Sequence, residues 1–319
     1  MSTATRVPET RDLDGDDARD TLASVGKVQL LKSSFARLRA ADGTSHARSL
    51  AFMVSLCLVQ TLIVLLGAAS SFGNIGLTSA VANNLGSAVP GPAGAVLTDA
   101  VHQARKVGEL HQYAPLFVGL LGLVVTATFA MGQMERGLNR IYGVERDRPA
   151  RRKYERALIL AVSVGPMFAA ALLLVGFAPD PKDPSITFGD VWVYGRWVVA
   201  VALVAVALAL LLRFSPNRHQ PGRAWLAFGA LTGVTLWFAA TALLALGFRL
   251  AATFPQTYGP LAGIVALLLW GYVSALSIFY GVAVAAELEA TRAHVRETVA
   301  TQEDPLPVTA TRALVHPLT

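Results

Sequence analysis

The sequence has only one cysteine, and it lacks the residue patterns that are typical of metal, nucleotide or catalytic sites. Its single cysteine, Cys57, excludes a disulfide and a cysteine-based metal site. The six histidines are scattered, and none joins an Asp or Glu at the spacing of metal ligands. No glycine-rich loop is followed by Lys and Ser or Thr, which argues against a bound ATP. We therefore expect no catalytic residues, no metal and no cofactor, and the chain is not predicted to be an enzyme.

Charge is also scarce, because only 15% of the 319 residues are charged, against roughly 25% in a soluble domain. The deficit falls in apolar runs of about the 20 residues that a helix needs to cross a bilayer. None of them has an acid or base near its centre. A buried core helix is the alternative for any one run, but core helices are usually shorter. A β-barrel is not favoured, because its strands would alternate apolar and polar residues, whereas these runs are apolar on every face. The runs predict an all-α membrane protein with six transmembrane helices, at residues 49–70, 113–131, 157–177, 194–212, 224–246 and 260–284.

The basic residues are unevenly divided between the two sets of connections. The N-terminal 48 residues, the 132–156 and 213–223 connections and the C-terminal tail hold 22 Lys and Arg, whereas the alternate connections hold five. The positive-inside rule then predicts that both termini are cytoplasmic. The segment before the first run is too long and too acidic for a cleaved signal peptide.

The segments outside the runs give the remaining organisation. Residues 1–24 lack periodicity and are predicted to be a disordered leader, and residues 299–319 a flexible tail, on either side of a membrane domain at 25–298. Residues 27–40 place Val28, Leu31, Phe35 and Leu38 at helical spacing among basic residues, which predicts an interfacial amphipathic helix. The long 71–112 connection predicts a small outer cap of two amphipathic helices, acting as a lid or packing over helix ends.

The stretch from Met134 to Arg156 has eight basic residues and four acids. Met131, Met134, Leu138 and Ile141 form a helical stripe, so the second span is predicted to continue beyond the apolar run. Arg136 and Arg140 are four residues apart and therefore neighbours on one helix face.

Two like charges on one face favour a nearby anion. Glu135, Glu287 and a lipid phosphate are the candidates, and the arginine fork suits phosphate. We predict a lipid- or anion-binding site formed by Arg136, Asn139, Arg140, Arg151 and Arg152, with membrane lipids as partners. The alternative is that the cluster only anchors the topology. Nucleic acid is not expected, because only two tyrosines accompany the charges.

The last run carries unusual polar and small residues. They are expected to serve helix packing or to line a cavity, and they are Trp270, Tyr272, Ser274, Gly281 and Glu287. Glycine lets a neighbouring helix approach closely, so a homo-oligomer is possible. Glu287 and Glu289 follow the apolar stretch and are expected to be solvated at the surface, unless one of them is the anion beside the arginines.

Two segments of the chain carry a resemblance to a known family. MERGLNRIYGVERDRPARRKYERAL and YGPLAGIVALLLWGYVSALSIFYGVAVAAELEA resemble the cytoplasmic signature and the final span of the YihY/virulence factor BrkB family, and LGSAVPGPAGAVLTDAV is similar to its outer loop. The likeness covers roughly residues 35 to 292. It implies a six-helix protein of the bacterial inner membrane. Older members are named ribonuclease BN, but the resemblance implies no settled activity, and no nuclease residues accompany it here.

Two functions therefore stay open. The first is a transporter or flippase-like protein for an anionic lipid or amphipathic metabolite, which a multi-span bundle with paired arginines favours. The second is a non-transporting membrane scaffold or envelope-integrity protein that binds partners through its cytoplasmic segments. A membrane-bound nuclease is a distant third.

Overall fold

The chain is described by a computed structural model for residues 4–9, 13, 15–71, 91–94, 99, 113–144, 146–176, 189–251 and 260–293. Within these ranges the fold is helical and contains no β-strand. The helices are α1 (Gly15–Val25), α2 (Lys27–Ala40), α3 (Gly43–Ser71), α6 (Ala114–Ile141), α7 (Ala150–Gly176), α8 (Gly189–Phe214), α9 (Arg223–Leu250) and α11 (Pro260–Arg292).

Six of these helices, α3, α6, α7, α8, α9 and α11, are long and apolar enough to cross a membrane, so the six predicted spans are confirmed as candidate spans. Most extend beyond the apolar runs. The predicted continuation of the second span is confirmed, because α6 runs on to Ile141 and buries Met134, Leu138 and Ile141.

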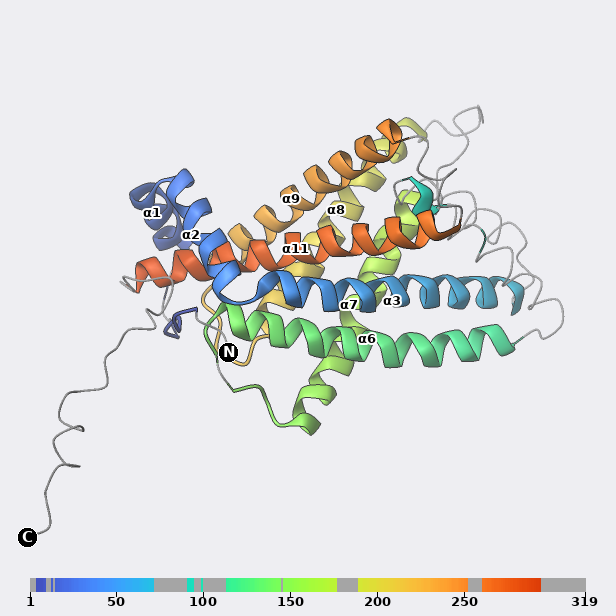
Figure 1. Ribbon diagram of the computed structural model, residues 1–319, viewed down its shortest axis with the longest axis horizontal. Coiled ribbons are helices and arrows are strands. Elements are labelled where there is room, and N and C mark those ends of the chain that lie inside the picture. The colour runs from blue at the N-terminus through green and yellow to red at the C-terminus, as the bar shows by residue number, and fades with distance from the viewer. Residues whose placement is uncertain are drawn as a thin grey trace, which may run out of the picture.

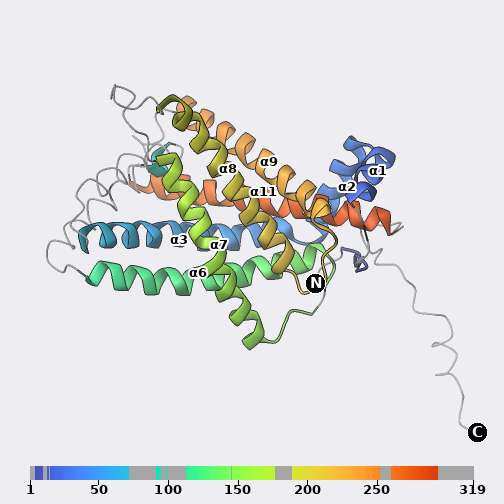
Figure 2. The same cartoon turned by 180° about the vertical axis from the view of Figure 1, so that it is seen from behind.

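Helix α11 lies at the centre of the bundle (Figure 1) and packs against α9, α3, α6, α2 and α1. Helices α3 and α6 run side by side along it, while α7 and α8 cover the back (Figure 2). Helix α7 crosses the bundle obliquely, so its first turns project past α6 in both views.

The contact between α11 and α9 depends on glycine. A Cβ atom on Gly281 would lie 3.0 Å from the Cα of Gly233 and would clash with the carbonyl oxygen of Gly229. Two glycines four residues apart on α9 thus face a third on α11, an arrangement that lets apolar helices pack backbone to backbone in a membrane.

Large apolar side chains on the outer surface of the bundle are exposed. Examples are Phe117 and Leu121 on α6, Ile159 on α7 and Leu243 on α9. An apolar surface this continuous is unusual for a water-soluble monomer and fits contact with lipid.

Polar segments gather at one end of the bundle, called here the polar end. It consists of α1, α2, the connector at 142–149, the connector at 215–222 and the last turns of α11 (Figure 1). A short break shapes it: Ala41 and Asp42, the latter with φ of 54°, separate α2 from α3.

The expectation of a disordered leader over residues 1–24 is wrong for residues 15–24, which belong to α1. Asp16 and Asp17 occupy the first turn, where the helix dipole favours negative charge. Ala18 is fully buried and packs in a small cluster with Trp225 and Leu288. Tertiary packing therefore stabilises a helix whose own sequence is too polar to predict it.

Helix α2 only partly matches its predicted stripe. Leu38 is buried against the protein together with Leu30 and Arg37, whereas Val28, Leu31 and Phe35 are exposed. The exposed trio keeps the helical spacing expected of an interfacial helix. The predicted outer cap over 71–112 and the predicted tail at 299–319 lie largely or wholly outside the described residues.

Candidate functional site

The predicted site begins where α6 ends. Gly143 has a φ of +68°, and its backbone N–H donates to the carbonyl of Arg140 at 3.1 Å. The N–H of Val144 donates to the carbonyl of Asn139 at 2.8 Å. A left-handed glycine followed by such bonds is a common helix stop. Pro149 then directly precedes α7, as the sequence allows.

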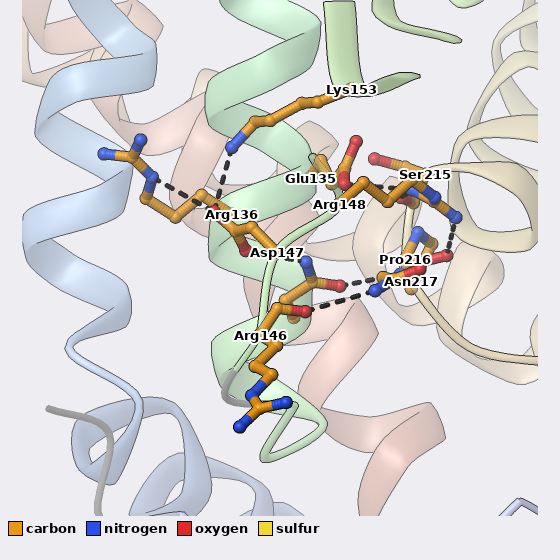
Figure 3. A network of polar contacts seen from close by, with 10 residues as sticks. Glu135, Arg136, Arg146, Asp147, Arg148, Lys153, Ser215, Pro216 and Asn217 are labelled. Carbon is orange, nitrogen blue, oxygen red and sulfur yellow. Dashed lines mark hydrogen bonds and ion pairs between the residues drawn. The ribbon is translucent and has the colours of Figure 1, made fainter. Parts of the chain in front are cut away.

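Asp147 is the centre of the first polar group (Figure 3). Its carboxylate accepts hydrogen bonds from Asn139 Nδ2 and Lys153 Nζ, both at 2.9 Å, and Arg136 Nε lies 3.6 Å away. Burial alone would raise the pKa of Asp147, but the hydrogen bonds and charges of Asn139, Lys153 and Arg136 lower it. Asp147 therefore joins the end of α6 to the first turn of α7.

Arg148 forms the second group (Figure 3). Its guanidinium lies 3.0 Å from the Glu135 carboxylate and donates to the carbonyl oxygens of Ser215 at 2.8 Å and Pro216 at 2.6 Å. Both charged side chains are buried. Burial lowers the pKa of Arg148, and the charge of Glu135 opposes that shift.

Asn217 completes the link between the two connectors. Its backbone N–H donates to the side-chain oxygen of Asn139 at 2.7 Å, and its amide donates to the carbonyl of Arg146 at 3.1 Å. Asn139 is fully buried and uses both ends of its amide. It is therefore a structural residue of the connectors.

Two further ion pairs lie at the C-terminal end of α11. Arg37 Nε of α2 donates to Glu287 at 2.7 Å, and Arg218 forms a two-pronged pair with Glu289. The Arg218 guanidinium also stacks over the Tyr142 ring, 4.4 Å from its centre. Burial raises the pKa of Tyr142, with Glu289 adding to the shift.

The predicted arginines divide into two kinds of environment. Arg140 is half-buried and carries a polar interaction of its own. Arg136 remains 51% exposed despite its contact with Asp147. On α7, Arg151 is 91% exposed and pairs with Glu155 at 2.9 Å, and Arg152 is exposed as well.

The carboxylate beside Arg136 is Asp147, and the expectation of Glu135 or Glu287 there is wrong. Glu135 pairs with Arg148 and Glu287 pairs with Arg37, while a lipid phosphate near the arginines stays a prediction. The expectation that Glu287 and Glu289 are solvated is also wrong, because both are buried and Glu289 is fully so.

The predicted residues of the last span lie in helix contacts. Trp237 Nε1 of α9 donates to Ser274 Oγ at 2.9 Å, and the rings of Trp237 and Trp270 meet edge to face at 6.3 Å. Tyr272 packs against the main apolar cluster, and Gly281 faces α9. These residues therefore contribute to packing around α11.

The residues that the sequence analysis missed are Arg37, Asp147, Arg148, Arg218 and Glu289, all of them in the buried polar groups. The only available signal was an excess of arginine beside acids, which does not tell which ones meet. No group of His, Cys, Asp and Glu within the described ranges is arranged to hold a metal ion.

Six candidate membrane spans, joined at one end by buried ion pairs, are the architecture of a multi-pass helical membrane protein. The Virulence factor BrkB family model matches residues 34–306, and the chain belongs to this family. The resemblance noted in the sequence is thereby confirmed.

Three relatives illustrate the family. The chain is 26% identical to the ribonuclease-like protein YfkH of Bacillus subtilis (strain 168) over 80% of this chain and 93% of YfkH. It is 33% identical to UPF0761 membrane protein RSc1559 of Ralstonia nicotianae over 54% of this chain and 40% of that protein. It is 28% identical to UPF0761 membrane protein XAC0937 of Xanthomonas axonopodis pv. citri over 77% of this chain and 58% of that protein. The chain thus matches about half the length of the two UPF0761 relatives. No solved structure matches it.

Proposed function

We propose that this BrkB-family protein is a transporter or flippase-like protein for an anionic lipid or an amphipathic metabolite, and that it is not an enzyme. One observation carries the proposal: exposed arginines stand directly beside an apolar outer surface. Arg151 and Arg152 open α7, and Leu158, Ile159 and Val162 are exposed within the next three turns. An anionic amphiphile presents the same two features, a charged head beside an apolar chain.

The chemistry of the arginines supports a phosphate or carboxylate head. A guanidinium can donate two parallel hydrogen bonds to either group and is more weakly hydrated than an ammonium ion. The projection of α7 from the side of the bundle (Figures 1 and 2) makes its first turn accessible from lipid. Arg136 on α6 adds a third exposed cation.

We further propose that the protein lies in the bacterial inner membrane with its polar end in the cytoplasm. The excess of basic residues on that set of connections supports this orientation. It would bring the exposed arginines to the leaflet whose anionic lipids attract basic segments, by about 1 kcal/mol per residue.

The alternative function is a non-transporting scaffold, and the buried ion pairs favour it. Arg148 and Arg218 fix both connectors, and Arg37 fixes α2 to α11. Removing one partner of a buried pair is strongly unfavourable. A polar end fastened in this way suits a rigid platform as well as the fixed part of a transporter.

The deciding experiment compares wild type with the Arg151→Gln/Arg152→Gln variant in two assays. Native mass spectrometry in mild detergent should show an anionic lipid retained by wild type and lost from the variant, and reconstituted liposomes should show its movement between leaflets. The matched control is Arg249→Gln, an exposed arginine at the other end of the bundle. Equal lipid retention in all three proteins would refute recognition by these arginines. Retention without movement would favour the scaffold.

A further inference from the structure

The first described residues of the chain form a short strap across the polar end. This strap, residues 4–9, has no helix and buries only two side chains, Ala4 and Val7. The side chains of Arg6, Pro8 and Glu9 are exposed. Nothing in the composition of this segment indicated an ordered contact.

Three main-chain groups hold the strap to three different elements. Arg37 Nη1 of α2 donates to the carbonyl of Thr5 at 3.0 Å. The N–H of Val7 donates to the carbonyl of Tyr142 at 3.1 Å, and Arg218 Nη2 donates to the carbonyl of Pro8 at 2.9 Å. Main-chain bonds combined with a pocket for one side chain are the usual means by which proteins bind extended peptides.

Gly143 lets the strap come close. A Cβ atom added there would lie 2.6 Å from the Cα of Arg6 and 2.7 Å from the carbonyl oxygen of Thr5. The same glycine adopts a φ of +68° to end α6. The turn after α6 therefore provides a floor on which another backbone can rest.

The strap also shares its partners with the buried ion pairs. Arg37 binds the strap through Nη1 and Glu287 through Nε, while Arg218 binds both Pro8 and Glu289 through Nη2. Both guanidinium groups are buried. The same two guanidinium groups therefore hold both the strap and the last turns of α11.

We propose that the polar end carries a groove for an extended peptide, formed by α2, the turn after α6 and the 215–222 connector, and that its ligand is the chain's own strap. The strap binds and leaves as a unit, because so few of its side chains are buried. This inference does not rest on the proposed transport function.

The test supplies the strap in trans to the full-length chain. Val7→Lys puts a cation in place of a side chain that is buried in the main apolar cluster, and it should therefore empty the groove. A fluorescent peptide of residues 4–13 should bind the Val7→Lys protein at least tenfold more tightly than wild type, because a tethered strap competes at about millimolar effective concentration. The Val7→Lys peptide should bind that protein at least tenfold more weakly, and the Arg6→Lys peptide, changed at an exposed position, should bind within twofold of the unaltered peptide.

Failure of the Val7→Lys protein to bind the unaltered peptide, or equal binding of all three peptides, would overturn the proposal. A second measurement covers the case in which that protein does not fold. In an otherwise wild-type chain carrying Thr5→Cys and Cys57→Ser, saturating peptide should increase maleimide labelling at position 5 severalfold, and the Val7→Lys peptide should not. An unchanged labelling rate would overturn the proposal equally.

Discussion

Arg148 shows how a single buried cation joins distant parts of the chain. It neutralises Glu135 on α6, and it also satisfies two carbonyl groups of the 215–222 connector, which lies 67 and 68 residues further along the chain. Carbonyl groups left inside a protein without a donor are unfavourable. The residue is therefore both a charge partner and a cap for a loop that has no regular structure.

This double role predicts an asymmetry between the two partners. Arg148→Met should lower the free energy of unfolding by about 3–5 kcal/mol, because it leaves Glu135 charged and buried and frees two carbonyls. Glu135→Gln should lower it by less, because glutamine keeps an acceptor and Arg148 keeps its carbonyl bonds. Denaturant titrations in mixed micelles measure both values, with Arg151→Met as the exposed control. Equal losses for the two variants would contradict the double role.

Asp147 predicts an acid dependence of stability. Its pKa is lower in the folded protein than in the unfolded chain, so the unfolded chain takes up the proton first as pH falls. Its stabilising contribution is complete above the ordinary aspartate pKa of about 3.9 and is lost as pH falls through the lower folded value. The stability difference between wild type and Asp147→Asn should therefore begin to shrink as pH falls toward the ordinary aspartate pKa of about 3.9, and it should continue to shrink below it.

The measurement is the unfolding midpoint of both proteins across that pH range. Glu155→Gln, which alters an exposed carboxylate, should instead follow the wild-type curve at all pH values. If the difference in unfolding midpoint between wild type and Asp147→Asn stays constant with pH, the contacts of residue 147 with Asn139 and Lys153 stabilise the protein without needing its charge.

Helices and connectors differ in how far the sequence reveals them. The six spans follow from hydropathy alone, since a helix in lipid must be long and apolar whatever it packs against. Helix α1 could not be recognised, because its buried Ala18 stands among acids and gains stability only from Trp225 and Leu288. The ion pairs could not be assigned, because Arg37 and Glu287 are 250 residues apart and many other acids were equally available.

The close contact between α9 and α11 depends on Gly281, which predicts the effect of adding a methyl group there. Gly281→Ala should destabilise the protein by about 1–3 kcal/mol, because the new methyl group would meet the backbone of Gly229 and Gly233, which cannot move without separating the helices. Gly247→Ala on α9 is the matched control, since its added Cβ meets nothing within 4 Å. Unfolding in mixed micelles compares the two. Similar stabilities would show that the helices are less tightly packed than the structure has them.

At the scale of the whole molecule, the polar end and the lateral surface of the bundle have different characters. The polar end fixes both connectors and α11 through three buried ion pairs, and the Arg37–Glu287 and Arg218–Glu289 pairs join distant parts of the chain. The lateral surface is apolar between the ends. A change in the arrangement of the helices would either leave these ion pairs in place, with the helices shifting relative to the polar end, or require the pairs to open. The strap at residues 4–9 contacts the arginines of two of these pairs.

The orientation of the molecule gives the last prediction. Six candidate spans together with the 22 basic residues on one set of connections predict that both ends of the chain lie on the same side of the membrane, in the cytoplasm. In a Cys57→Ser background, Arg152→Cys and Ala313→Cys should resist a membrane-impermeant maleimide in intact spheroplasts and react after permeabilisation. Asn84→Cys, in the 71–112 connection, should react in both. Labelling of position 152 in intact spheroplasts would reverse the orientation and move the exposed arginines to the outer leaflet. Labelling of position 84 only after permeabilisation would contradict the crossing of α3.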